Sequence, residues 1–144
     1  MPIISFNYGK MLIEKKKDQI KGDVKVKNDL VLQSLTLTDI DIGKKKQEVI
    51  KLNFEFLTEY QPGLGNISIG GTILFLESAD NIKLITDMWK KEKKIPQQFA
   101  ANIINVILTK SNIKALELSQ SVNLPPHIRL PMILPKQDFK NYIG

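Results

Sequence analysis

The chain has 144 residues, of which 42% are hydrophobic, and its formal net charge is +6. A domain usually has about 100–150 residues, so we expect one domain over residues 1–144. Cysteine is absent, which excludes disulfides, thiolate metal sites and cysteine nucleophiles in this sequence. Arg129 is the only arginine among the 21 basic residues. Because lysine lacks the planar fork that recognises phosphates and bases, the charge does not favour a nucleic-acid reader.

The sequence shows no membrane or export signal. It contains no run of about 18 consecutive apolar residues, so we predict no membrane insertion. Residues 1–6 lack the charged region, the long apolar core and the cleavage site of a signal peptide. We therefore expect a cytoplasmic protein.

Apolar and polar residues alternate through most of residues 1–78, which is typical of β-strands. Strand patterns occupy residues 3–17, 20–27, 35–40, 49–60 and 67–76. The pair Asn28-Asp29 predicts a bulge or a tight turn, and residues 41–46 predict a solvated loop.

The strand expected at residues 49–60 has the clearest alternation. One of its faces is apolar and is formed by Ile50, Leu52, Phe54 and Phe56. The return strand contains Gly70-Gly71, which predicts a bend or a bulge. Residues 73–76 are apolar on both faces, so we expect this end of the strand to be covered on both sides.

Two helices follow the strands. The first is expected at residues 79–93, capped by Ser78 or Asp80, and its buried side is predicted to be Ile82, Leu84, Ile85, Met88 and Trp89. Pro96 predicts the start of the second helix, which runs to about residue 120. That helix has apolar residues at 99, 103, 107 and also at 100, 104, 108, a stripe wider than one sheet contact needs. Either both sides are buried in one subunit, or one side packs against another subunit.

No catalytic arrangement stands out. Carboxylates at 48, 55, 59, 77, 80 and 87 form no pair near a histidine. His127, the only histidine, is interpreted as a packing or capping residue and excludes a site built from several histidines. The glycines at 63, 65, 70 and 71 lie between or within strands, where they do not form a phosphate loop. We predict a protein that is not an enzyme, with no catalytic residue, no metal site and no cofactor.

Lysines cluster at residues 15–17, 44–46 and 90–94. On one face they would bind RNA electrostatically, whereas scattered lysines provide solubility and protect strand edges. The sequence has no aromatic stacking series, which favours the second interpretation. The alternative function is a basic RNA- or ribosome-associated protein whose polyanion contacts are Lys90, Lys91, Lys93 and Lys94.

The remaining feature is apolar surface. The tail at residues 122–133 contains three prolines among aliphatic residues, so it cannot continue the helix and must lie extended against an apolar surface. Taken together, the aromatic strand residues and the tail suggest a self-association face or a groove for an extended peptide. The predicted groove residues are Phe6, Tyr8, Phe54, Phe56, Leu124, Ile128, Leu130 and Met132.

Several stretches resemble the SecB family of export chaperones and its SecB-like relatives. Residues 54–56 through 71–75 resemble the central hairpin of the family. The helix from Gln97, followed by residues 122–126, resembles its oligomerising helix and its Asn-Leu-x-Pro segment. The resemblance spans residues 6–134. It implies an α+β fold with an antiparallel sheet of about four strands covered on one face by two C-terminal helices. It also implies a dimer of dimers that holds unfolded chains in hydrophobic grooves without ATP.

By that resemblance, the tail from Leu124 would form one wall of a groove and would face Phe6 and Tyr8. The helix residues predicted to divide between sheet packing and an oligomer interface are Ile103, Ile104, Ile107 and Leu108. The chain departs from the family in its basic charge, because the family recruits the translocation motor through acidic sheet surface. We therefore predict a homo-oligomeric holdase for unfolded polypeptides, without assigning it to an export pathway.

Overall fold

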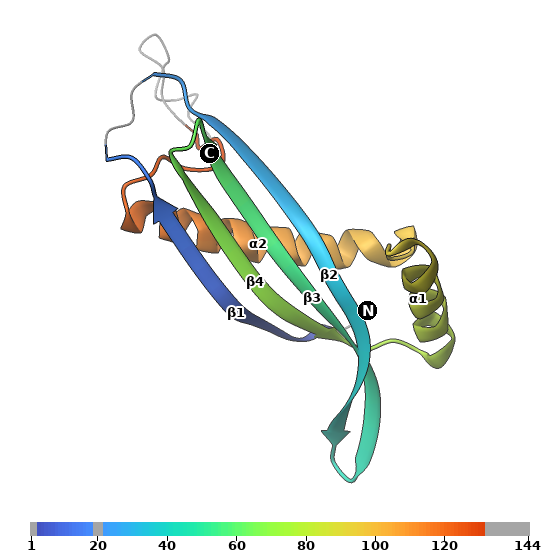
Figure 1. The fold of residues 1–144 in the computed structure, drawn as a ribbon. Helices are drawn as coiled ribbons and strands as arrows, with labels where there is room; N and C mark the ends of the chain where they lie inside the picture. The colour runs from blue at the N-terminus through green and yellow to red at the C-terminus, as the bar shows by residue number, and fades with distance from the viewer. Residues whose placement is uncertain (1–2, 19–21, 132–144) are drawn as a thin grey trace, which may run out of the picture.

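The structure, a computed structural model, describes residues 3–18 and 22–131. Its elements are β1 (Ile3–Lys15), β2 (Lys25–Ile42), β3 (Lys45–Gln61), β4 (Gly65–Phe75), α1 (Ala79–Glu92) and α2 (Gln97–Ser121). The strands form one antiparallel sheet in the order β1-β4-β3-β2, so β1 and β2 are its edges (Figure 1). This confirms the predicted α+β fold, an antiparallel sheet of four strands followed by two helices.

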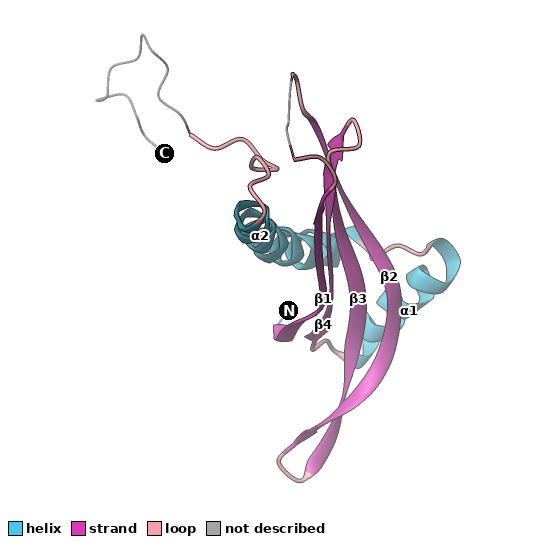
Figure 2. Ribbon diagram, turned by 60° about the vertical axis from the view of Figure 1, so that its left-hand side comes forward, coloured by secondary structure: helices cyan, strands magenta, loops and turns pink. Residues whose placement is uncertain are grey.

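The helix α2 crosses one face of the sheet, and α1 lies beside the sheet next to β2 (Figures 1 and 2). The buried residues of α2 recur at every fourth position: Phe99, Ile103, Ile107, Ser111, Ala115 and Ser119. Positions four apart lie on one side of a helix. One stripe of α2 therefore packs on the sheet, and its flanking positions are left half-buried or exposed. Ile82, Ile85 and Trp89 of α1 extend the same core cluster.

The predicted alternation of β3 is confirmed. Its apolar residues from Ile50 to Phe56 face α2 and are at most 1% exposed, whereas Lys51 is exposed on the other side. Residues opposite each other in an antiparallel pair share a face of the sheet. The register therefore places Tyr8, Gly71, Phe54 and Leu32 in one row across the four strands, facing α2.

The irregularity at Gly70-Gly71, predicted there as a bend or a bulge, lies not in β4 itself but in the strand that pairs with these two residues. The register shift lies in the neighbouring strand β1, between Tyr8 and Lys10. Gly71 instead makes room for an aromatic ring, because a Cβ at this position would lie 2.8 Å from Cζ of Phe54.

The predicted interruption of the second strand at Asn28-Asp29 is wrong. These residues lie inside β2 and pair with Thr58 and Leu57 of β3. The irregularity of β2 comes later, between Leu32 and Ser34. Asn28 remains in the ladder because its side chain has partners on the helix-facing side of the sheet, described below.

The predicted burial of Leu84 in α1 and of Leu74 in β4 is wrong, because each of these elements buries only one side. Leu84 is 52% exposed, because the buried stripe of α1 consists of Ile82, Ile85 and Trp89. Leu74 is half-buried rather than covered on both sides, since α2 lies on the opposite face of β4. Within residues 3–18 and 22–131, neither helix is long and apolar enough to cross a membrane.

Candidate functional site

An apolar groove lies between the edge strand β2 and α2. It consists of two adjoining cavities of about 490 Å³ and about 360 Å³. Both are lined by Asp29, Leu30 and Ile104, so they form one continuous depression. The larger cavity is also lined by Val31, Leu32, Lys93, Lys94, Ile95 and Ala100, and the smaller one by Asn28, Phe56 and Leu108.

The groove opens on the β2 side of α2 because the β1 side is filled. On that side the Tyr8 hydroxyl donates a hydrogen bond to the carbonyl of Lys110 at 3.0 Å. The Lys110 Nζ lies 5.3 Å from the ring centroid of Phe6. At the β2 end of the same row the residue is Leu32, which is too short to fill the corresponding space.

The two walls of the groove have similar lengths. Along α2 it runs from Ala100 to Leu108, a distance of about 12 Å at 1.5 Å per residue. Along β2 it runs from Asn28 to Leu32, which is about 13 Å in a strand. Both walls therefore match about four residues of extended chain.

Lysines line one end of the groove. Lys93 follows α1 in the left-handed conformation, and its backbone N–H donates to the carbonyl of Trp89. Lys94 follows it and is exposed. Within the described part of the chain the ion pairs are Lys10–Glu55 and Lys114–Glu117, so Lys93 and Lys94 form none there. Asp29 is the one carboxylate in the lining of the larger cavity, so the two lysines leave the charge of this lining positive.

The segment after α2 closes the other end. The Thr58 hydroxyl donates to Oδ1 of Asn28 at 2.7 Å, and Nδ2 of Asn28 donates to the backbone carbonyl of His127 at 3.2 Å. The Tyr60 hydroxyl donates to the carbonyl of Pro125 at 2.6 Å. The chain from Leu124 to His127 is thereby fixed to β2 and β3.

His127 is a packing residue in this structure. Its side chain is 3% exposed, Nε2 lies 2.7 Å from Oδ1 of Asn112, and its ring meets that of Phe56 edge to face. Burial lowers the pKa of His127, because desolvation disfavours the charged imidazole. The residue therefore stabilises the docked segment in its neutral form.

The predicted groove residues differ in exposure. Phe54 and Leu124, at 0% and 4% exposure, are buried in the core, so neither lines an open groove. Phe56 is 1% exposed and contributes only to the groove floor. Ile128 and Leu130 are 37% and 44% exposed, and Met132 lies outside the described residues.

The described hydrogen bonds of the tail do not join it to Phe6 or Tyr8, which the sequence predicts opposite it, although Tyr8 packs against the core cluster that contains Leu124. The tail makes hydrogen bonds to Tyr60 of β3 and Asn28 of β2, toward the opposite edge of the sheet from β1. Phe6 and Tyr8 are half-buried beside Lys110 and Lys114 of α2. The wall facing α2 is formed by β2 instead.

The four predicted interface residues separate into two pairs. Ile103 and Ile107 are 0% exposed against the sheet, so they offer no surface to a second subunit. Ile104 and Leu108 are half-buried and line the groove. The homo-oligomer stays a prediction. Leu30 and Leu32 are not among the residues predicted from the sequence, because Asn28-Asp29 predicts a bulge or a tight turn at the point where their own alternation begins.

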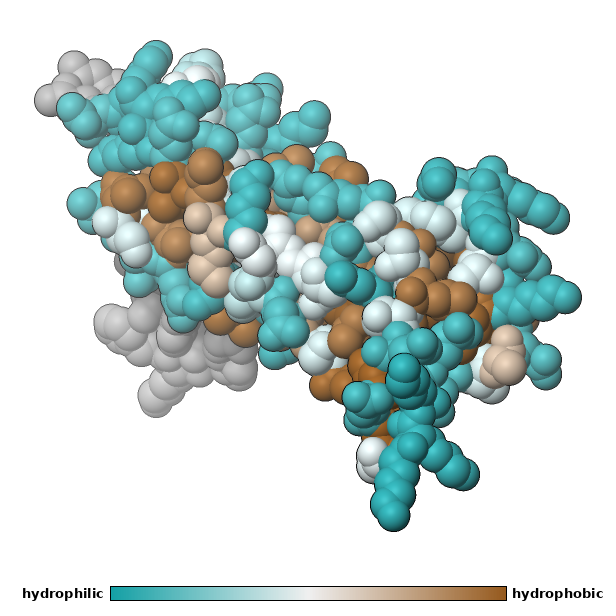
Figure 3. All heavy atoms as spheres, turned by 60° about the horizontal axis from the view of Figure 1, so that its bottom comes forward, coloured by the Kyte–Doolittle hydropathy of each residue, from teal (hydrophilic) through white to brown (hydrophobic). Residues whose placement is uncertain are grey.

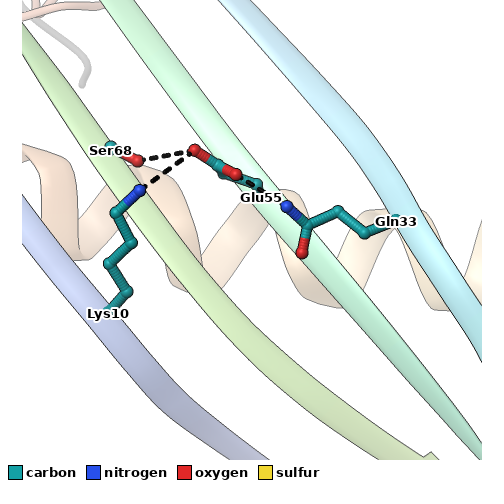
Figure 4. A network of polar contacts seen from close by, with 4 residues as sticks. All are labelled: Lys10, Gln33, Glu55 and Ser68. Atoms are coloured by element: carbon teal, nitrogen blue, oxygen red, sulfur yellow. Dashed lines mark hydrogen bonds and ion pairs between the residues drawn. The ribbon is translucent and has the colours of Figure 1, made fainter.

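The sheet face opposite α2 carries a polar network (Figure 4). Oε1 of Glu55 accepts hydrogen bonds from Oγ of Ser68 at 2.8 Å and from Nζ of Lys10 at 3.4 Å, and Oε2 accepts from Nε2 of Gln33 at 2.7 Å. The hydrogen bond from Ser68, helped by Lys10 and Gln33, holds the pKa of Glu55 below its ordinary value. Each of the four strands contributes one residue, so the network fastens the sheet.

The lysine clusters lie at separate ends of the molecule. Lys15 ends β1, residues 44–46 lie at the tip of the hairpin between β2 and β3, and residues 90–94 end α1 (Figure 1). In the surface view, hydrophilic side chains project from the extremities and apolar patches lie between them (Figure 3). Lys90, Lys91, Lys93 and Lys94 are exposed, and their contact with a polyanion stays a prediction.

No protein-family model and no curated protein sequence matches the chain significantly. A solved structure that resembles it is a SecB-like chaperone of Mycobacterium tuberculosis in complex with a ChAD peptide from an antitoxin. The two share 11% sequence identity and have a TM-score of 0.49, over 92% of this chain and 89% of that chain. The two proteins are therefore similar in the course of the backbone and hardly in sequence.

Proposed function

We propose that this protein is an ATP-independent holdase that binds extended apolar segments of unfolded polypeptides in the groove between β2 and α2. The observation that carries the proposal is the half-exposed pair Ile104 and Leu108, which lines cavities shared with Leu30. Burial of apolar area contributes about 25 cal/mol per Å² and has no direction, so such a groove accepts many sequences. The contacts require neither a cofactor nor a catalytic residue.

The proposal is tested by titrating a fluorescent, unstructured apolar peptide with the protein and following its anisotropy. We expect Ile104→Asp to weaken binding about tenfold or more, because a bound apolar segment would desolvate the new carboxylate. Ile113→Asp is the matched control, since Ile113 lies on the same helix, is 57% exposed and does not line the groove. Circular dichroism checks that both variants keep their helices.

The same variants are compared in an assay of client aggregation. Wild-type protein and Ile113→Asp are expected to suppress aggregation of an unfolded client, and Ile104→Asp is expected to lose this activity. Suppression should change little with salt, because apolar contacts rather than ion pairs hold the client. Equal loss in both variants, or no peptide binding by the wild-type protein, would contradict the proposal.

A further inference from the structure

We propose that the bound segment joins the sheet as an additional strand along β2, and that it carries an acidic residue at the Lys93–Lys94 end. The inference rests on the proposed function and specifies the substrate: about four extended apolar residues flanked on one side by Asp or Glu. Two observations carry it, the uncovered edge of β2 and the charge at one end of the groove.

Beside the groove, β2 is an edge strand of the described sheet, and one of its backbone groups is bonded locally, because the N–H of Leu30 donates to Oδ1 of Asp29 at 2.9 Å, a bond that a pairing strand would replace. In the described part of the chain β2 pairs with β3 alone, so half of its backbone N–H and C=O groups have no partner strand. The cavity that β2 shares with α1 is lined by Leu35, Thr36 and Leu37, which leaves residues 28–32 beside the groove. The register shift after Leu32 ends the regular stretch of β2.

Pairing with β2 would involve the backbone of the bound peptide, whereas the apolar groove would contact its side chains. In a strand, successive side chains point to opposite faces. A peptide paired with residues 28–32 would therefore direct every second side chain toward Ile104 and Leu108, while its backbone amides bond to β2. Backbone pairing contributes affinity and the cavities select the side chains. On the β1 side, the Tyr8 hydroxyl bonds to the Lys110 carbonyl, so the Tyr8 side chain occupies the corresponding space beside α2.

The charge of the groove selects a flanking residue. Lys93 and Lys94 line the cavity at the end that contains Leu32 and Ile95. Nζ of Lys93 lies 5.8 Å from the ring centroid of Trp89, a distance at which the ring attracts a cation. A carboxylate on the peptide would complement these lysines, whereas a basic residue would be repelled.

Backbone pairing is tested with three versions of one peptide: unmodified, and N-methylated on either alternating set of amides. N-methylation removes the donor. We expect one set to weaken binding about fivefold per blocked hydrogen bond and the other set to leave it nearly unchanged. Equal affinities, or equal weakening by both sets, would overturn strand addition. If strand addition were overturned but Ile104→Asp still abolished binding, the proposed function would stand. If the unmodified peptide did not bind, both strand addition and the proposed function would be overturned.

The acidic preference is tested with Lys94→Glu and two peptides that differ only in the flanking residue, Glu or Lys. We expect the variant to weaken binding of the Glu peptide about two- to fivefold and to strengthen binding of the Lys peptide, as for an exposed ion pair. Lys91→Glu, which lies on α1 outside the cavity lining, changes the net charge equally and should affect neither peptide. Equal effects of the two variants would overturn the assigned acidic flank.

Discussion

Gly71 shows how one missing side chain allows the core to pack. A Cβ at this position would lie 2.5 Å from the carbonyl oxygen of Asn7 and 2.8 Å from Cζ of Phe54. Both distances are shorter than van der Waals contact, and the first involves backbone that cannot easily move. We expect Gly71→Ala to lower the free energy of unfolding by about 1–3 kcal/mol, the usual cost of overpacking. Urea unfolding measures this change.

The neighbouring glycine supplies the control. A Cβ at Gly70 would meet Cβ of Lys10 at 3.4 Å, which is ordinary contact. Gly70→Ala should therefore change the free energy of unfolding by less than Gly71→Ala does. Equal destabilisation by the two variants would contradict the role assigned to the row of Tyr8, Gly71, Phe54 and Leu32.

His127 makes stability depend on pH. Burial lowers its pKa below the ordinary value of 6.5, so the unfolded chain takes up a proton that the folded chain resists. Protonation of His127 in the unfolded chain should therefore lower the free energy of unfolding as pH falls below 6.5. Above pH 6.5, His127 is neutral in both states and should not change the free energy of unfolding. We expect His127→Gln to flatten the dependence between about pH 7.5 and about pH 5.5, measured by urea unfolding. An unchanged slope would mean that another group titrates there.

The segment after α2 behaves as a docked element, and Leu124 is its anchor. Leu124 is 4% exposed and packs in a cluster with Phe56, Tyr60 and Ala115. Leu124→Ala should lower the free energy of unfolding by about 2–5 kcal/mol, because it leaves a cavity. Ile128→Ala should cost less than about 1 kcal/mol, since Ile128 is 37% exposed. Thermal unfolding of both variants checks the difference, and similar costs would show that the segment is not anchored in this way.

Local patterns predicted the elements better than the site. The alternation of β3 and the four-residue spacing of α2 are properties of single segments, so periodicity revealed their buried faces. The groove depends on which strand lies at the edge and on the difference between Tyr8 and Leu32 in one row. That row is created by pairing between distant segments, which no local pattern encodes. The alternation of β3 alone therefore predicts Phe54 as a groove residue, whereas in the structure it is buried under α2.

At the scale of the whole molecule, the groove results from an asymmetry. The helix α2 crosses a sheet whose β1 side is filled by aromatic residues and whose β2 side is not. In the described residues, the groove therefore has apolar walls, a strand edge paired on one side only and two lysines at one end, whereas the opposite sheet face is held by the Glu55 network. An extended polypeptide matches these three properties together.

The most direct measurement is photocrosslinking of an unfolded client from defined positions on α2. A benzophenone amino acid replaces Leu108, which lines the groove, or Ile113, which lies on the same helix outside it. We predict that the client crosslinks from position 108, that an excess of unlabelled apolar peptide suppresses this crosslink, and that position 113 gives little product. Equal crosslinking from both positions, or crosslinking from 113 alone, would contradict binding in the groove.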